Sequence, residues 1–213
     1  MSTVAVIDYG MGNLHSIAKA LQHADTSVNV QISADAHVIQ AADRVVFPGV
    51  GAMRDCMQAL QALKLVDVIK NVAQDKPFLG ICLGMQALLT DSEENGGIAC
   101  LNLFPGHVRH FAEPLFDELD HSLKVPHMGW NRVRQKPHPL WQDIAQDSRF
   151  YFVHSYYAIP DSEQDSIASS AYPQPFTCAL AKNNVFAVQF HPEKSQTVGL
   201  QLLQNFLRWD GAA

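Results

Sequence analysis

A cysteine with a glycine two residues away on each side is the strongest chemical feature of this sequence, in GICLG at residues 80–84. That spacing is typical of a nucleophile elbow, with Cys82 where hydrolases carry serine. A strained strand-to-helix turn would present the thiol, and the helix N-terminus would favour its thiolate form. The first backbone N–H groups of that helix would be free to receive an oxyanion. The alternative is an inert buried cysteine, since free cysteines are among the most buried residues.

A histidine and a glutamate after an apolar run supply what a thiol nucleophile needs. Residues 185–190, VFAVQF, predict a buried strand that ends directly at His191. A nucleophilic thiol requires a base, and the base requires a group that fixes its tautomer. Glu193 lies two residues on, so its carboxylate can return to the imidazole. Cys82, His191 and Glu193 therefore predict a catalytic triad, against the alternative of a surface turn with an ordinary glutamate.

The first half of the chain predicts the elements that position the cysteine. Apolar residues at helical spacing alternate with short β-branched runs. Strands are expected at 3–8, 28–32, 44–47 and 77–81, and helices at 14–21, 53–60 and 65–73. This alternation favours a parallel sheet with right-handed crossovers. The glycine turn after the first strand lacks the third glycine of GxGxxG, which disfavours dinucleotide binding.

The second half of the chain has a different pattern. Residues 91–97, DSEENGG, predict a polar surface loop, and strands with short connections follow. These strands are expected at 106–111, 131–134, 149–154, 166–171, 177–181 and 185–190, and a final helix at 198–209. The predicted fold is a three-layer α/β domain with a mostly parallel central sheet and an antiparallel extension.

Composition limits the function classes. The chain has 213 residues, 47% hydrophobic and 17% charged, which fits one domain spanning 1–213. A net charge of −6 argues against binding to nucleic acid or to an anionic membrane. The four cysteines show no CxxC spacing, and neither a signal peptide nor an apolar run of roughly 20 residues is present, so we expect a reduced, cytoplasmic protein. The ten histidines show no metal-binding spacing, so neither a metal nor another cofactor is expected.

Two segments resemble the signatures of class I glutamine amidotransferases: GICLGMQ at 80–86 and QFHPEKS at 189–195. Four more segments are similar to one branch of that family, which supplies ammonia for imidazole glycerol phosphate formation in histidine biosynthesis. They are YGMGN at 9–13, FPGVGA at 47–52, PHMGWN at 126–131 and YFVHSY at 151–156. The resemblance covers essentially the whole chain and implies a flavodoxin-like fold.

The resemblance also implies a reaction. Cys82 would attack the side-chain amide of L-glutamine, His191 would carry the proton to the departing ammonia, and Glu193 would orient His191. Water would then hydrolyse the glutamyl thioester. The oxyanion hole would combine the N–H of Leu83 with a glycine loop whose peptide can turn inward, made of Gly49, Val50 and Gly51.

Further residues follow from the same resemblance. Gln86 would face the substrate, Glu94 would receive its α-amino group, and Ser155 and Tyr156 would line the bound glutamine. The family implies a heterodimer with a cyclase subunit of TIM-barrel type, which makes imidazole glycerol phosphate and an aminoimidazole carboxamide ribonucleotide. The residues expected at the partner surface are Asn13, Trp130 and Lys194.

Three alternatives stay open at this point. The chain could serve another acceptor, in anthranilate or pyridoxal phosphate synthesis. It could be a stand-alone cysteine hydrolase, which predicts full turnover without a partner. It could also be an inactive binding module, although such a module would be expected to lose the nucleophile, the base or the orienting acid.

Overall fold

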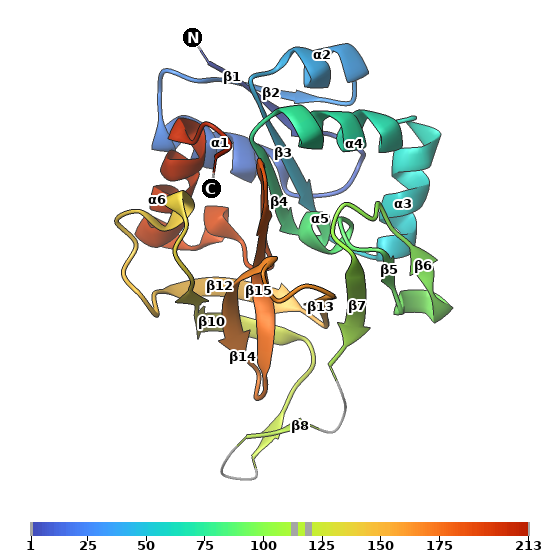
Figure 1. The fold of residues 1–213 in the computed structure, drawn as a ribbon, viewed down its shortest axis with the longest axis vertical. Coiled ribbons are helices and arrows are strands. Elements are labelled where there is room, and N and C mark those ends of the chain that lie inside the picture. Colours follow the sequence, from blue (N-terminus) through green and yellow to red (C-terminus); the bar gives the residue numbers. More distant parts are fainter. Residues whose placement is uncertain (1, 112–114, 118–120, 213) are drawn as a thin grey trace.

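A parallel sheet forms one half of the molecule, which we describe from a computed structural model for residues 2–111, 115–117 and 121–212 (Figure 1). Its strands are, in spatial order, β2 (Asn29–Ser33), β1 (Thr3–Ile7), β3 (Arg44–Gly49), β4 (Phe78–Cys82) and β16 (Val185–Val188). Neighbouring strands in this group all pair in parallel. Because helices cover both faces, β4 and β16 are apolar and buried along their whole length.

Helices lie on both faces of this parallel half. One face carries α1 (Leu14–Ala24) and α6 (Gln196–Arg208); the other carries α2 (Ala36–Ala41), α3 (Met53–Ala62) and α4 (Val66–Asp75). Alternation along β1 separates the two cores, since Val4 packs with the α1 side and Ala5 with the α3 side. The α/β fold and its three layers are confirmed.

The other half of the sheet is antiparallel except where β5 pairs in parallel with β7. It continues from β16 through β15 (Pro175–Lys182), β13 (Tyr156–Pro160) and β7 (Gly106–His110) to β5 (Asp91–Ser92) and β6 (Ile98–Ala99), with β14 (Ser166–Ala171) on β15 and β11 (Arg134–Gln135) on β14. Two further ribbons pair β10 (His127–Arg132) with β12 (Arg149–His154), and β8 (Leu115–Phe116) with β9 (Ser122–Leu123). The β8 ribbon projects from the body at the lower end of Figure 1.

The structure differs from the sequence predictions mainly in this half. Strand β13 was not predicted, and β10 begins at His127, four residues before the predicted start at Asn131. The segment 91–97 is more than a surface loop, because β5 extends the sheet by pairing with β7 and β6, and its Ser92 is buried. Such two-residue strands leave no periodicity in a sequence.

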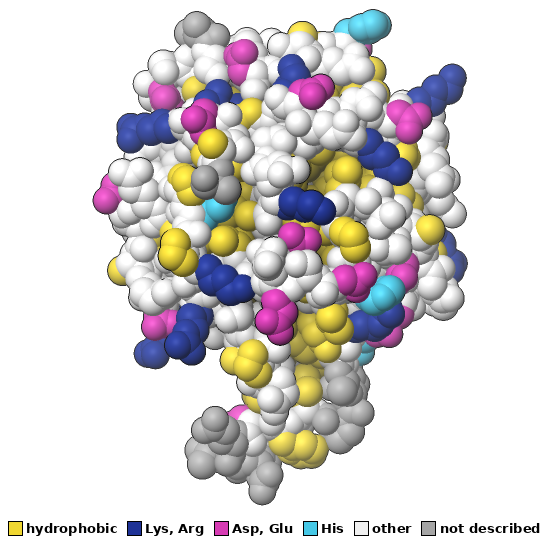
Figure 2. Space-filling model, viewed as in Figure 1, with side chains coloured by type: hydrophobic (Ala, Val, Ile, Leu, Met, Phe, Trp, Pro, Cys, Tyr) yellow, Lys and Arg dark blue, Asp and Glu magenta, His cyan; other side chains and the backbone are white. Residues whose placement is uncertain are grey.

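Charged side chains are distributed over the surface without a single-sign patch on the face shown in Figure 2. Lysine and arginine alternate there with aspartate and glutamate. Among the described residues, none of the helices combines the length and the apolar character that crossing a bilayer requires.

Candidate active site

Cys82 lies at the turn where β4 ends and the short helix α5 (Leu83–Gln86) begins. Its backbone φ is +55°, a left-handed value that is uncommon for a non-glycine residue and typical of strained functional turns. Gly84 makes the turn possible, because a Cβ there would lie 2.0 Å from the carbonyl oxygen of Phe47. The nucleophile elbow predicted from GICLG is therefore present in the backbone.

The glycine loop after β3 lies against the elbow. Gly49 pairs with Cys82 across the β3–β4 ladder. A Cβ on Gly49 would lie 2.4 Å from the Tyr9 hydroxyl oxygen and 2.9 Å from Cβ of Leu83, so this approach requires glycine. Gly51 has a φ of +95°, a second conformation that favours glycine. The loop is therefore held beside the first residue of α5.

His191 and Glu193 form a buried pair shortly after the strand β16, which ends at Val188 rather than at the predicted residue 190. The Nδ1 atom of His191 lies 2.8 Å from Oε1 of Glu193, and the two side chains are 3% and 2% exposed. The turn is the 3₁₀ helix η3 (Pro192–Lys194), which folds the carboxylate back onto the ring. Because an ionised carboxylate only accepts hydrogen bonds, Nδ1 carries the proton. Nε2 of His191 is buried and makes no hydrogen bond to any described residue.

The electrostatics of this pair favour a protonated imidazole. Burial lowers the pKa of His191, but the interactions with Cys82 and Glu193 outweigh burial and raise it to about 10. Burial raises the pKa of the Cys56 and Cys100 thiols to about 12, which keeps them protonated at neutral pH.

A cavity of about 360 Å³ brings the predicted residues together. That volume lies within the usual range of small-molecule sites. Its lining includes Val50, Gly51, Cys82, Leu83, Gln86, Glu94, Ser155, Tyr156 and His191. Gly49 and Glu193 lie behind this lining, each supporting a residue that reaches the cavity. Pro126, Val153 and His154 complete the wall.

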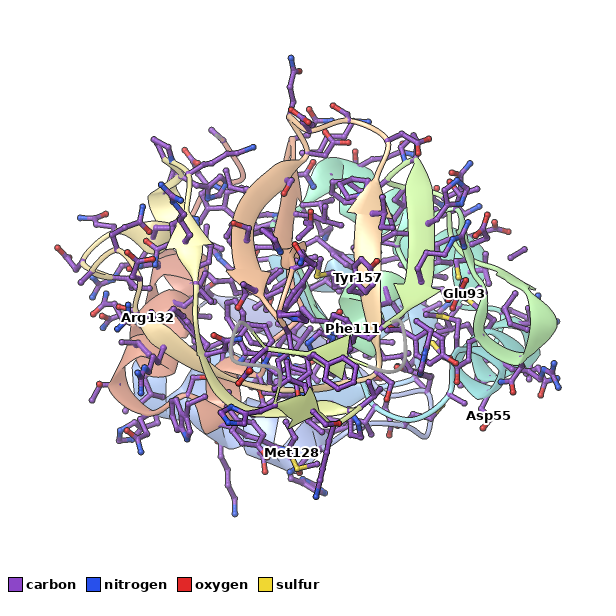
Figure 3. All side chains as sticks on the ribbon, turned by 90° about the horizontal axis from the view of Figure 1, so that it is seen from below. Asp55, Glu93, Phe111, Met128, Arg132 and Tyr157 are labelled. Atoms are coloured by element: carbon purple, nitrogen blue, oxygen red, sulfur yellow. The ribbon has the colours of Figure 1, made fainter. Side chains whose placement is uncertain are left out.

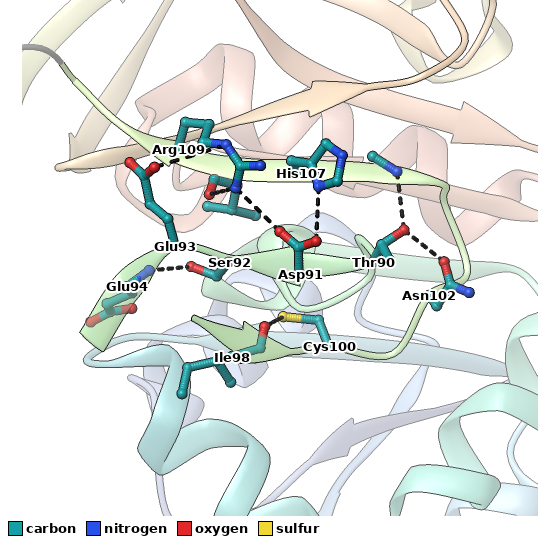
Figure 4. Close-up of polar contacts among 12 residues, drawn as sticks. Thr90, Asp91, Ser92, Glu93, Glu94, Ile98, Cys100, Asn102, His107 and Arg109 are labelled. Carbon is teal, nitrogen blue, oxygen red and sulfur yellow. Dashed lines mark hydrogen bonds and ion pairs between the residues drawn. The ribbon is translucent and has the colours of Figure 1, made fainter. Parts of the chain in front are cut away.

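Glu94 reaches the cavity from the segment between β5 and β6 (Figure 4). Its Oε2 accepts a hydrogen bond of 2.8 Å from the backbone N–H of Met53, the first residue of α3. This contact with the N-terminus of α3 fixes the position of the Glu94 carboxyl group at the cavity edge. The neighbouring ion pairs of Asp91 with His107 and Arg109 are part of the half-exposed outer surface.

Two histidines near the cavity had no predicted role. Nδ1 of His154 lies 2.8 Å from the carbonyl oxygen of Tyr156, and its Nε2 lies 2.9 Å from Nδ1 of His127. Burial lowers the pKa of His127 to about 4 and that of His154 to about 3, so both rings are neutral at pH 7. Their presence in PHMGWN and YFVHSY was the available sequence signal, but their contact depends on the β10–β12 register, which pairs His127 with His154.

Gln189 is a third site residue, besides the two histidines, that sequence reasoning missed. It is fully buried, and its Nε2 lies 3.7 Å from the sulfur of Cys82. Its Oε1 accepts a 2.8 Å hydrogen bond from Nε2 of Gln86. Gln86, predicted to face the substrate, therefore lines the cavity and also contacts a neighbour of the nucleophile.

The residues predicted for the partner surface are all exposed. Trp130 packs edge-on against the ring of Tyr151, and Nζ of Lys194 lies 5.8 Å above the same ring. Met128, two residues before Trp130 on β10, is 61% exposed and points outward (Figure 3). Asn13 stands at the start of α1, which packs against η3. The chain thus presents aromatic and apolar side chains close to the catalytic turn.

Comparison with known proteins assigns this fold and site to a class. Residues 5–209 match the family described as Glutamine amidotransferase class-I. Because this match covers nearly the whole chain, the protein belongs to the class I glutamine amidotransferase family.

Two relatives that are similar over nearly the whole chain carry the same name. The chain is 62% identical to the imidazole glycerol phosphate synthase subunit HisH of Methylococcus capsulatus, over 99% of this chain and 98% of that protein. It is 58% identical to the protein of the same name from Pseudomonas syringae pv. syringae, over 99% of each chain.

Solved structures agree on the fold. One described as a glutamine amidotransferase superposes with a TM-score of 0.72 at 14% identity, covering 96% of this chain and 97% of the other. The structure of PurLQS from Thermotoga maritima gives a TM-score of 0.71 at 14% identity, covering 97% of this chain and 98% of the other.

Proposed function

We propose that this protein hydrolyses L-glutamine to glutamate and ammonia as the glutaminase subunit of imidazole glycerol phosphate synthase, in histidine biosynthesis. Relatives with that name, 53–62% identical over nearly the full chain, support this acceptor over anthranilate or pyridoxal phosphate synthase. The observation that carries the chemistry is the convergence of Cys82 and His191 on one cavity, with Glu193 bonded to the imidazole. The chain acts as one cytoplasmic domain, residues 1–213.

The reaction follows from the order of these groups. The Cys82 sulfur attacks the amide carbon of glutamine, and the carbonyl oxygen becomes an oxyanion. Protonated His191 gives its Nε2 proton to the leaving nitrogen, the C–N bond breaks, and ammonia departs from a glutamyl thioester. Water then attacks the thioester carbon while neutral His191 takes a proton from it. The C–S bond breaks, glutamate is released, and the Cys82 thiolate and protonated His191 are restored. Glu193 keeps the ring oriented and stabilises its charge throughout.

The oxyanion is received by backbone groups at the elbow. The Leu83 N–H is the first of α5 and has no partner within the helix. The loop Gly49–Gly51 supplies a second donor once a peptide turns inward, which its glycines allow at low steric cost. Glu94 receives the α-amino group of the substrate, while Gln86, Ser155 and Tyr156 enclose it.

The ammonia is delivered to a cyclase subunit of TIM-barrel type. Free ammonia is protonated in water and lost by diffusion, so hydrolysis without a waiting acceptor wastes glutamine. The partner binds the face containing Asn13, Trp130 and Lys194, which lies beside the catalytic turn. Its binding favours the conformation of the loop Gly49–Gly51 in which a peptide N–H points into the site. The products are imidazole glycerol phosphate and an aminoimidazole carboxamide ribonucleotide.

Glutamate release tests this proposal in three samples: the isolated subunit, the complex, and the complex with the cyclase ligand. The isolated subunit should be slower than the loaded complex by at least about 100-fold, the value of one oxyanion donor. A Cys82→Ala complex supplied with ammonium salt is the control, and it should still form imidazole glycerol phosphate. Equal rates for the isolated subunit and the loaded complex would instead support a stand-alone hydrolase.

A further inference from the structure

Gln189 is the described side chain whose polar contact with the nucleophile the mechanism above does not use. It directly follows β16, lies two residues before His191, and has no exposed surface. Its backbone N–H donates to the carbonyl oxygen of Cys178 on β15, so its main chain is fixed by the sheet. Its side chain therefore lies in the core, 3.7 Å from the sulfur of Cys82.

The direction of this contact is set by a neighbouring carbonyl. Nε2 of Gln86 lies 2.9 Å from the backbone oxygen of Tyr156, which can only accept, so that atom of Gln86 must be the amide nitrogen. The same nitrogen lies 2.8 Å from a side-chain atom of Gln189, which must then be the oxygen. The remaining amide atom of Gln189, the one facing the sulfur, is therefore an N–H donor.

A donor at this position matters because the thiol is buried. Cys82 is 7% exposed, so little water can solvate a negative sulfur. Hydrogen bonds to a charged form favour that form, and those made to charged groups are worth more than neutral ones. His191 interacts with the same sulfur as a positively charged group. Gln189 is thus the neutral donor of the site.

We propose that Gln189 donates its side-chain N–H to the sulfur of Cys82 and stabilises the thiolate, and that Gln86 and the Tyr156 carbonyl hold this amide in the donating orientation. Gln86 then has two roles: it lines the cavity and fixes its neighbour. The inference rests on the proposed role of Cys82 as nucleophile, but it concerns the ionisation of a thiol, which can be measured without glutamine or a partner.

The test is the pH dependence of Cys82 alkylation by iodoacetamide, read by mass spectrometry on the peptide that contains Cys82. Gln189→Met keeps the length of the side chain and removes both polar atoms. Gln189→Glu keeps the oxygen that accepts from Gln86 and replaces the donor by an acceptor. The matched control is Gln201→Leu on α6, whose side chain bonds only to Gln204 and Asn205 of the same helix among the described residues.

We expect the midpoint of alkylation to move up by about one pH unit in Gln189→Met, a tenfold loss of thiolate below the midpoint. Gln189→Glu should raise it further, because a carboxylate oxygen then faces the sulfur. Gln86→Met should give a smaller rise, since it frees the Gln189 amide without removing it. Gln201→Leu should titrate as the wild type does.

Two outcomes would overturn the proposal. One is a wild-type alkylation midpoint in Gln189→Met. The other is a wild-type alkylation midpoint in Gln189→Glu, which would mean that Gln189 only anchors Gln86. Thermal melts identify a variant that does not fold, in which case the Gln86→Met shift decides. A raised midpoint in a protein that releases no glutamate, even in the loaded complex, would uphold this inference while the proposed function fails.

Discussion

The two sides of the cavity are held by different forces. On the side of Cys82, the backbone does the positioning: a φ of +55° is imposed by a strand, a helix and two glycines that leave no space for a Cβ. On the opposite side, where β10, β12 and β13 meet, the wall is held by side-chain hydrogen bonds from His154 and His127. The structure of the Cys82 side depends on the absence of side-chain volume at two glycines. The structure of the opposite wall depends on the protonation state of two histidines.

This difference separates two kinds of sensitivity. Close backbone approach excludes even one methyl group but is independent of pH. Both imidazoles are neutral at pH 7, and Nε2 of His154 accepts the hydrogen bond from Nδ1 of His127. Protonation of that Nε2 would remove the acceptor on which the contact between the two rings depends. His191 and Glu193 combine both kinds of sensitivity. A short turn of the backbone sets their position, and their chemistry depends on charge. Glycine variants on the Cys82 side should therefore lower the free energy of unfolding, whereas histidine variants on the opposite wall should change its dependence on pH.

The largest effect is expected on the backbone side, from Cys82→Ala. Removing the nucleophile should abolish glutamate release by the complex, a loss of roughly 10⁴-fold or more. A glutamine-analogue electrophile should label Cys82 in the wild type. The control is Cys100→Ser, outside the cavity lining, which should retain activity. Wild-type turnover in Cys82→Ala would refute the assignment of the nucleophile.

Variants of the base His191 and of its partner Glu193 should lower kcat by different amounts. His191→Ala should lower kcat by roughly 10³-fold or more, because thiol and leaving group both lose their proton carrier. Glu193→Gln should cost less, since its amide oxygen can still accept from Nδ1 and orient the ring. Loss of the carboxylate should also lower the pKa of His191 from about 10, visible in the pH profile of kcat. Equal small losses in both variants would place the base elsewhere.

Glycine substitutions test the volume limit directly. In Gly84→Ala the new Cβ would lie 2.0 Å from the Phe47 carbonyl oxygen, so β3 and α5 must separate. We expect a loss of about 3 kcal/mol in the free energy of unfolding, at the upper end for overpacking. Gly96→Ala is the control, because it has open space but a φ of +85°, and should lose about 1 kcal/mol. Denaturant titration compares the two, and equal losses would contradict a volume limit.

Sequence patterns predicted the backbone side much better than the opposite wall. Strands buried on both faces give continuous apolar runs in the sequence. The segment GICLG contains a glycine that the elbow needs, at the spacing typical of such a turn. The triad could be predicted because Cys82 and His191 each follow such a run. The wall could not, because β13 is partly exposed and gives no continuous apolar run, and the contact of His127 with His154 exists only in one register of β10 on β12.

Gln189 shows a second limit of sequence reasoning. The apolar pattern of residues 185–190 correctly predicted burial, and the glutamine in it was visible. Its contact with sulfur depends on β16 lying next to β4, which is a pairing between residues far apart in the chain. The interface residues stay predictions for a related reason, since exposure of Trp130 fixes a surface but not its occupant.

The smallest effect is expected on the protonation side, in the pH dependence of stability. The pKa of His127 falls to about 4 in the folded state from an ordinary value near 6.5, and burial is the cause. Between these values the unfolded chain binds more protons, so stability should fall as pH drops from about 6.5 to 4. His154 and His138 are also buried with lowered pKa values and add to the slope, whereas His191 is protonated in both states over this range.

Each such histidine contributes at most about 1.4 kcal/mol per pH unit. His127→Gln should therefore flatten the slope of the unfolding free energy by up to that amount, while lowering stability at pH 7 through the lost contact with His154. Chemical denaturation at half-unit pH steps from 4 to 7 measures both effects. The comparison variant is His23→Gln, on the exposed face of α1. If His127→Gln keeps the wild-type slope, the wall is held by packing, and the contrast between the two sides of the cavity is lost.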